Sequence, residues 1–240
     1  MKRSDTSLRA AESRLTALIA EYGLKEATFE PLLAILEALG GEHAPTAVKD
    51  PQEGVDVHIG DSLSGLSTVQ AGPHEVIADI GSGCGVPALI LAVALPDSEV
   101  VAVESQRRKC DFVEEAAAAA GLTNIKSAWA RAEEWEEGFS GCDVVTARAL
   151  ADLPVVLEYA APLLKPKGRV IAWKGKLEDD ELTRGTVAAE ALALSSPELT
   201  EVEPWIGGGV RKIAVAERIG ELPQGFPRRP GMATKRPLGS

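Results

Sequence analysis

A glycine-rich turn between an apolar segment and a long helical segment constrains the fold of this chain more than any other feature. The stretch reads VIADIGSGCGVPALILAVAL over residues 76–95, with glycines at positions 81, 83 and 85. Glycines at the end of a strand let the chain turn sharply and let a ligand approach the backbone. The helix that follows presents free N–H groups. The pattern therefore predicts a site for a dinucleotide, a nucleoside or a phosphate, or simply a tight bend.

Strand-like and helical segments alternate after this turn. The sequence predicts strands at residues 76–80, 99–104, 125–130, 142–148 and 168–175, with helices at 86–95, 107–121, 153–164 and 177–194. This alternation implies a parallel sheet with helices on both faces. Two last segments, 198–205 and 210–218, flank Ile206 and three glycines, which favours an antiparallel hairpin.

The expected fold class is therefore α/β: a Rossmann-like, seven-stranded, mostly parallel sheet that ends in a C-terminal antiparallel hairpin. This arrangement is typical of class I methyltransferases that use S-adenosylmethionine, whereas a dinucleotide-binding domain normally continues with another parallel βαβ unit. Before the sheet, apolar spacing predicts helices at residues 6–22, 26–39 and 55–66. We expect an N-terminal helical extension packed on the core (1–72), a methyltransferase core domain (73–221) and a basic, proline-rich tail (222–240).

Composition bounds the class of protein and its compartment. Hydrophobic residues make up 45% of the chain, which is enough for a sizeable core. Cys84, Cys110 and Cys142 are odd in number and widely spaced, which argues against a disulfide framework or a zinc site. With no secretory leader and no apolar run of about eighteen residues, we expect a cytoplasmic protein with no membrane partner and no metal.

Charge is distributed unevenly along the chain. The net charge of −11, taken alone, argues against a nucleic-acid partner. Residues 222–240, however, contain no acidic residue and four basic ones, Arg228, Arg229, Lys235 and Arg236. Such a tail is either a solvated terminus or a segment that binds phosphates.

An acidic residue at the glycine turn favours one cofactor over another. The dinucleotide fingerprint G-x-G-x-x-G/A fits at Gly83, Gly85 and Ala88, so a nicotinamide cofactor stays open on pattern alone. Asp79 lies two residues before Gly81, and a carboxylate there repels a pyrophosphate but attracts an amino-acid ammonium group. S-adenosylmethionine carries such an ammonium and no phosphate, so Asp79 favours S-adenosylmethionine.

Acidic residues after the next two strands suit the adenosine part of either cofactor. Glu104 ends the second predicted strand, where a carboxylate accepts hydrogen bonds from ribose hydroxyls. Ala132 and Glu133 follow the third predicted strand, where adenine is expected in both folds. These residues support a nucleoside pocket without separating the two cofactors, and the alternative for Glu104 is an ordinary charge at a strand end.

Several segments together resemble one protein family. They are DIGSGCGVPALILA, VAVESQRRKCDFVEEAA, ARAEE, DVVTARALADLPVVLEYAAPLLKPKGRVIAWKG and FPRRPGMATKRPLG. In this order they resemble the RsmG (GidB) family of bacterial small-subunit rRNA methyltransferases, from about residue 48 to the C-terminus. The chain departs from the family pattern at Val86 and Ala88 and in the upstream segment LEALGGEHAPTAVKDP.

The resemblance implies methylation of N7 of a guanosine in 16S rRNA, in the decoding-region loop of the small subunit, with S-adenosylmethionine as cofactor. It also implies 16S rRNA as partner, within the small ribosomal subunit or an assembly intermediate. Carried over to this chain, the family's cofactor contacts are Gly81, Val86, Ala132, Glu133 and Arg148. The arguments on the pocket add Asp79, Gly83 and Glu104 to the cofactor site.

Methylation of guanine N7 needs positioning rather than a general base, because N7 has a free lone pair. Arg148, after the fourth predicted strand, is the candidate catalytic residue, acting by positioning at the boundary between cofactor and base. Its alternative role is an ion pair with Asp152 on a helix face. The residues predicted to bind RNA phosphates are Lys174, Arg228, Arg229, Lys235 and Arg236.

Three other functions stay open at this point. The first is a methyltransferase acting on a small molecule or a protein, which the acidic body and the aromatic content of 4% suggest. The second is a nicotinamide oxidoreductase, and the third is a ribosome-binding protein without catalytic activity. The last leaves the cofactor-like turn unexplained.

Overall fold

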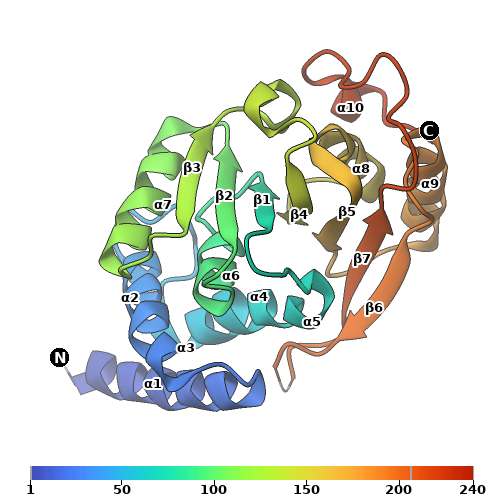
Figure 1. Ribbon diagram of the computed structural model, residues 1–240. Helices are drawn as coiled ribbons and strands as arrows, with labels where there is room; N and C mark the ends of the chain where they lie inside the picture. Colours follow the sequence, from blue (N-terminus) through green and yellow to red (C-terminus); the bar gives the residue numbers. More distant parts are fainter. Residues whose placement is uncertain (1, 206, 240) are drawn as a thin grey trace.

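Seven strands form one sheet in the computed structural model, which describes residues 2–205 and 207–239 (Figure 1). The strands are β1 (Val76–Ile80), β2 (Glu99–Glu104), β3 (Ile125–Trp129), β4 (Cys142–Arg148), β5 (Leu164–Trp173), β6 (Glu198–Val202) and β7 (Arg211–Glu217). Their order is β3–β2–β1–β4–β5–β7–β6. Strands β1 to β5 pair in parallel, whereas β7 runs antiparallel to both β5 and β6. The predicted fold class is confirmed.

Helices precede the sheet and connect its strands. They are α1 (Lys2–Glu21), α2 (Phe29–Gly40), α3 (Pro51–Gly54), α4 (Asp61–Leu63), α5 (Leu66–Val69), α6 (Ala88–Ala94), α7 (Arg107–Ala119), α8 (Leu153–Ala160), α9 (Asp179–Ala191) and α10 (Met232–Lys235). A π-helical segment, Val55–Gly60, lies between α3 and α4. Short 3₁₀ turns span Glu26–Thr28, Ala132–Glu134, Glu136–Gly138 and Ala161–Leu163.

The sheet separates two apolar layers. Successive side chains of a strand point to opposite faces, so in β1 Ile77 joins one layer and Ala78 joins the other. Helices α1, α2, α6 and α7 contribute to the first layer, and α8 and α9 contribute to the second (Figure 1). Leu15 and Ile35 of the N-terminal helices are fully buried in the same cluster as Ile77, so the extension shares its core with the sheet.

The structure differs from the sequence-based elements at several boundaries. The helix predicted at 55–66 is divided into a π-helical segment and short α-helical turns. Strand β5 begins at Leu164 rather than at 168, because Leu164 pairs with Cys142 before a register shift in the ladder. The hairpin link is longer than predicted, from residue 203 to 210, and Ile206 lies outside the described residues.

The C-terminal tail folds back on the second layer. Ala233 of α10 is 3% exposed and belongs to the cluster that contains α8. The Arg228 guanidinium donates to both carboxylate oxygens of the buried Glu158, at 2.6 and 2.5 Å. The described part of the tail is therefore packed on the sheet domain and is not a solvated terminus, and its predicted binding of phosphates stays a prediction.

All three cysteines are free thiols. In the described part of the chain, none of the helices has both the length and the apolar character required to cross a bilayer.

Candidate active site

The glycine turn lies at the carboxyl end of β1, where ligands bind in open α/β sheets. Its three glycines, Gly81, Gly83 and Gly85, all have positive φ angles, between 61° and 80°. A Cβ on Gly81 would lie 2.5 Å from Cδ1 of Leu150, so a side chain here would require Leu150 to move and would be strained by the φ of 67°. The turn therefore brings bare backbone close to the loop that follows β4.

Asp79 lies beneath the turn and offers an unused charge. It is 1% exposed, and its Oδ1 accepts a hydrogen bond from Thr146 Oγ1 at 2.9 Å. Its Oδ2 and the hydroxyl of Ser82 are both buried and form no hydrogen bond of standard geometry among the described residues, although Ser82 and the N–H of Ala88 lie close enough to lower the pKa of the carboxyl. Burial raises the pKa of Asp79 to about 6. A buried, unsatisfied carboxylate oxygen is costly, and a cationic ligand group would satisfy it.

Glu104 ties the end of β2 to the glycine turn. Its carboxylate accepts the N–H of Gly83 at 3.0 Å and the N–H of Gln106 at 2.9 Å. It also accepts from the hydroxyl of Ser105 at 3.2 Å. An ionised carboxylate has about four acceptor positions, so these three bonds leave about one position for a ribose hydroxyl. The structure thus brings together Gly83 and Glu104, which lie far apart in sequence.

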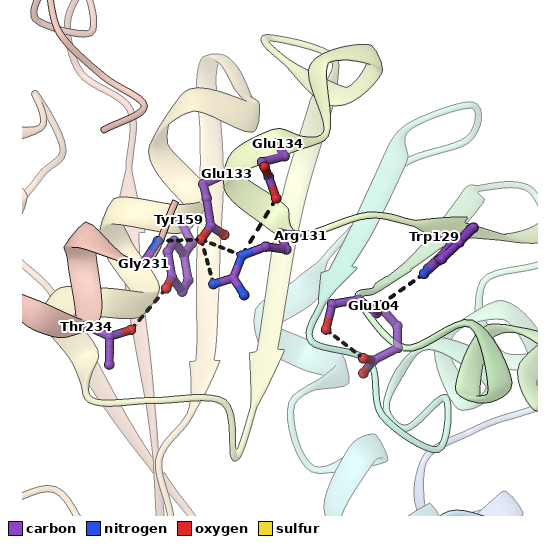
Figure 2. Close-up of polar contacts among 9 residues, drawn as sticks. Glu104, Trp129, Arg131, Glu133, Glu134, Tyr159, Gly231 and Thr234 are labelled. Carbon is purple, nitrogen blue, oxygen red and sulfur yellow. Dashed lines mark hydrogen bonds and ion pairs between the residues drawn. The ribbon is translucent and has the colours of Figure 1, made fainter. Parts of the chain in front are cut away.

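A cavity of about 270 Å³ opens beside the turn. Its lining includes Gly81, Ala132 and Glu133, together with Arg131 and Tyr159. Glu133 Oε1 accepts from the Arg131 guanidinium at 2.8 and 2.9 Å and from the N–H of Gly231 at 3.1 Å (Figure 2). The tail residue Thr234 also lines the cavity, and its hydroxyl lies 3.1 Å from that of Tyr159 (Figure 2). The tail therefore forms part of the pocket wall.

A second cavity, of about 460 Å³, lies on the other side of the segment that follows β4. Arg148 and Ala149 line the second cavity, whereas Leu150 and Ala151 line the first. Ala149 has a φ of 53°, a left-handed conformation that non-glycine residues rarely adopt. Because of this turn, the first two residues of the segment face the second cavity and the next two face the first. The segment therefore forms a wall that both cavities share.

Positive charge dominates the second cavity. Its basic lining residues are Arg148, Lys174, Lys176 and Arg211, and its acidic lining residue is Asp61. Arg148 binds Asp61 Oδ2 at 2.9 Å and the carbonyl of Val57 at 2.9 Å, so the predicted alternative with Asp152 is not formed. Asp152 instead lies 3.4 Å from Arg184.

The π-helical segment and its neighbours fix the position of Asp61. The Trp173 indole N–H donates to the backbone carbonyl of Asp61 at 2.9 Å. His58, on the preceding turn, is buried, and burial together with the positive charge of Arg148 lowers its pKa to about 4. His58 is therefore neutral near pH 7 and packs behind the cavity as an uncharged ring. π-Helical turns occur frequently at functional sites.

The predicted phosphate ligands occupy different surroundings. Lys174 Nζ is bound to Glu181 at 2.7 Å and to the carbonyl of Ala151 at 2.8 Å, and Arg228 is bound to Glu158. Arg229, Lys235 and Arg236 are exposed on the tail. Val86 is 4% exposed and precedes α6, outside the lining of both cavities. The roles assigned to all these residues stay predictions.

Sequence reasoning identified Arg148 and Lys174 but missed the other three charged residues that line the second cavity, Asp61, Lys176 and Arg211. Asp61 and Arg211 come from the N-terminal extension and from β7, and neither lies in a motif that marks a site. Arg131 and Thr234 were also missed, although Arg131 is part of the quoted segment ARAEE.

The donor groups present fit S-adenosylmethionine. The buried Asp79 Oδ2 and Ser82 Oγ suit its ammonium, the spare acceptor position of Glu104 suits a ribose hydroxyl, and the smaller cavity suits its adenine. A dinucleotide fits less well, because its pyrophosphate would face the carboxylate of Asp79.

Comparison with solved structures places the fold among methyltransferases. The structure of TrmN from Thermus thermophilus matches with a TM-score of 0.52 and 26% identity, covering 65% of this chain and 48% of that one. A SAM-dependent methyltransferase from Aquifex aeolicus matches with a TM-score of 0.53 and 16% identity, covering 70% and 93%. M. jannaschii TYW2, solved in complex with AdoMet, matches with a TM-score of 0.51 and 18% identity, covering 64% and 72%.

Comparison of sequences gives the family. The family model for GidB, rRNA small subunit methyltransferase G, matches residues 25–203. The ribosomal RNA small subunit methyltransferase G of Deinococcus radiodurans is 37% identical over 219 residues, which cover 89% of this chain and 85% of that protein. The protein of the same name from Deinococcus deserti is 34% identical and covers 95% and 96%. The chain therefore belongs to the GidB family of S-adenosylmethionine-dependent methyltransferases.

Proposed function

We propose that this protein transfers a methyl group from S-adenosylmethionine to N7 of a guanine in 16S rRNA of the small ribosomal subunit. The observation that carries the proposal is the wall shared by two cavities, one suited to the cofactor and one lined by cations. Relatives that cover most of the chain are named as small-subunit rRNA methyltransferases, which supports rRNA as the acceptor. We expect the reaction to occur in the cytoplasm, on an assembled subunit or an assembly intermediate.

The cofactor supplies an electrophilic methyl group bonded to a positively charged sulfur. With the cofactor bound, the N7 lone pair would form the new N–C bond and the electron pair of the S–C bond would stay with sulfur, so positive charge would pass to the base and no proton would move. The protein therefore needs no general base. Its tasks are to align the reacting groups and to surround them with suitable charges.

On this proposal, residues of this chain divide the work. Asp79 would bind the ammonium group, Glu104 a ribose hydroxyl, and the wall containing Ala132 and Glu133 the adenine. Arg148 would act at the boundary between cofactor and base, and Asp61 and the Val57 carbonyl hold its guanidinium. The exposed tail cations Arg229, Lys235 and Arg236 would bind RNA phosphates.

Transfer of labelled methyl groups tests the proposal. The purified protein is incubated with labelled S-adenosylmethionine and, separately, with small subunits lacking the modification, naked 16S rRNA and tRNA. We expect incorporation into the small subunits, and 7-methylguanosine as the product after nuclease digestion and mass spectrometry. Methylation of tRNA or of a metabolite, with none of the small subunit, would favour the alternative of a different acceptor class.

A further inference from the structure

The carboxylate of Asp61 lies in the cationic cavity with acceptor capacity to spare. Its side chain is 12% exposed, and its Oδ2 accepts from Arg148 at 2.9 Å. The contact of its Oδ1 with Arg211 Nε is 3.6 Å long, beyond hydrogen-bond range. Arg211 Nε is itself buried and lacks a hydrogen-bond partner within the described ranges 2–205 and 207–239. Asp61 Oδ1, which among the described residues forms only this long ion-pair contact, therefore lies next to an unsatisfied donor, Arg211 Nε.

This pattern is complementary to one edge of guanine. The Watson–Crick edge of guanine presents an acceptor, O6, followed by two donors, N1–H and the N2 amino group. A guanidinium next to a carboxylate presents one donor followed by two acceptors. Adenine presents a donor, the N6 amino group, followed by an acceptor, N1, at the corresponding positions. The lone pair of adenine N1 would therefore face the carboxylate, which repels it.

The position of Asp61 is fixed before any ligand binds. Trp173 holds its backbone carbonyl, and Arg148 ties its carboxylate to the carbonyl of Val57. Trp173 is 5% exposed and lines the same cavity. A recognition group held in this way loses little conformational entropy when the substrate binds.

Methyl transfer would strengthen the contact. The base becomes positively charged when N7 is methylated, and a hydrogen bond from its N1–H to a carboxylate gains strength as that charge develops. Interactions that are stronger in the transition state than in the ground state raise the rate of the chemical step. A carboxylate at this edge therefore both selects guanine and favours the reaction.

We propose that Asp61 recognises the target guanine by accepting hydrogen bonds from its N1–H and N2 amino groups, with Arg211 or Arg148 donating to O6. This inference rests on the proposed function, because it assigns the guanine edge to a cavity of the same site. It adds to the proposed function the residue that distinguishes guanine from the other bases.

A double substitution of protein and base tests the inference. Small subunits are reconstituted with 16S rRNA carrying either guanosine or inosine at the methylated nucleotide; inosine lacks only the N2 amino group. In the wild type we expect inosine to lower kcat/KM about 30-fold, because a buried acceptor loses its partner. Asp61→Asn should lower kcat/KM for guanosine about 100-fold, mainly through kcat, and inosine should then cost less than about 3-fold.

Matched variants separate recognition from structure. Asp56→Asn alters an acid of the π-helical segment that directly precedes Asp61. Asp56 pairs with Arg14 at 3.0 Å and does not line the cavity, so this variant should keep the wild-type preference for guanosine. Asp61→Glu keeps the charge that pairs with both arginines but moves the carboxylate by one methylene. It should keep cofactor affinity and lose at least about 10-fold in kcat/KM, which covers the case in which Asp61→Asn does not fold.

The outcomes are distinct. An equal cost of inosine in the wild type and in Asp61→Asn would show that Asp61 only holds Arg148 and Arg211, and would overturn the inference. Wild-type activity on inosine equal to that on guanosine would overturn it as well. Failure of the wild type on the guanosine subunits would instead contradict the proposed function, and this inference with it.

Discussion

The two cavities of the site are built in different ways. Strand ends and the turns directly after them form most of the cofactor cavity, with Gly81 after β1, Val103 and Ser105 at the end of β2 and Glu133 after β3. The cationic cavity takes Asp61 from the N-terminal extension and Arg211 from β7, on either side of Arg148. The parallel strands of the common fold therefore supply most of the cofactor cavity, whereas the cationic cavity also takes residues from the N-terminal extension and from the antiparallel strand β7.

The first test of this division is Asp79→Asn, for which we expect the largest effect. Loss of the charge that faces the ammonium should weaken S-adenosylmethionine binding about 100-fold, measured by calorimetry. The same variant should stabilise the unliganded protein at pH 7.5 by about 1–3 kcal/mol in urea unfolding, because it removes a buried charge whose pKa is raised to about 6. If Asp79→Asn bound S-adenosylmethionine with unchanged affinity, the ammonium group would have to bind elsewhere.

The C-terminal tail contributes to both parts of the site. It bears predicted RNA-binding residues, and it also lines the cofactor cavity. Arg228→Met leaves the buried Glu158 without its bidentate partner and should lower the free energy of unfolding by about 2 kcal/mol. Because Gly231 and Thr234 follow on the same segment, cofactor affinity should fall about 3- to 10-fold. Arg229→Met, at the exposed neighbouring position, is the control and should change neither quantity.

Deletion of the whole tail should affect cofactor binding as well as RNA binding. A basic terminus alone suggests that removal of residues 222–240 weakens RNA binding more than cofactor binding. The contacts of Gly231 and Thr234 predict that the deletion weakens both. Normal cofactor affinity of a protein truncated after residue 221 would show that the tail is dispensable for the pocket.

Acid should weaken cofactor binding through Asp79 alone. In the unliganded protein its pKa of about 6 makes the carboxyl neutral in an increasing fraction of molecules as pH falls. Between pH 6 and pH 5 the affinity for S-adenosylmethionine should therefore fall towards a limiting tenfold per pH unit. Asp79→Asn is the control, and its affinity should stay constant over the same range; a parallel loss would place the titrating group elsewhere.

Asp79 and His58 should change the stability of the protein in opposite directions as the pH falls. The raised pKa of Asp79 makes the folded state bind a proton more readily than the unfolded state, so this group favours folding as pH falls from 6 towards 4. The lowered pKa of His58 has the reverse effect, and its contribution is lost as pH falls from 6.5 to 4. The two contributions offset each other over most of this range.

The sequence predicts the cofactor half well for a physical reason. Its residues follow strands whose apolar runs are recognisable, and turn chemistry restricts positions such as Gly81 to glycine. Asp61 and Arg211 approach Arg148 only because the N-terminal helices and β7 pack against the same sheet, which no local pattern encodes. The π-helical segment was likewise predicted as part of an ordinary helix, since 3.6-residue periodicity does not reveal one inserted residue.

The smallest expected effect concerns the exposed tail cations and tests whether they belong to the acceptor side. Lys235→Ala removes one potential phosphate contact, so RNA affinity should fall about 3-fold and the slope of log K against log salt should decrease by about 1. Cofactor affinity should not change, because Lys235 is exposed and lies outside the lining of the cofactor cavity. Lys126→Ala is the matched control, since Lys126 on β3 pairs with Glu99 and lines neither the cofactor cavity nor the cationic cavity. If the slope of log K against log salt were the same for both variants, Lys235 would not contact RNA. The tail would then serve only to line the cofactor cavity.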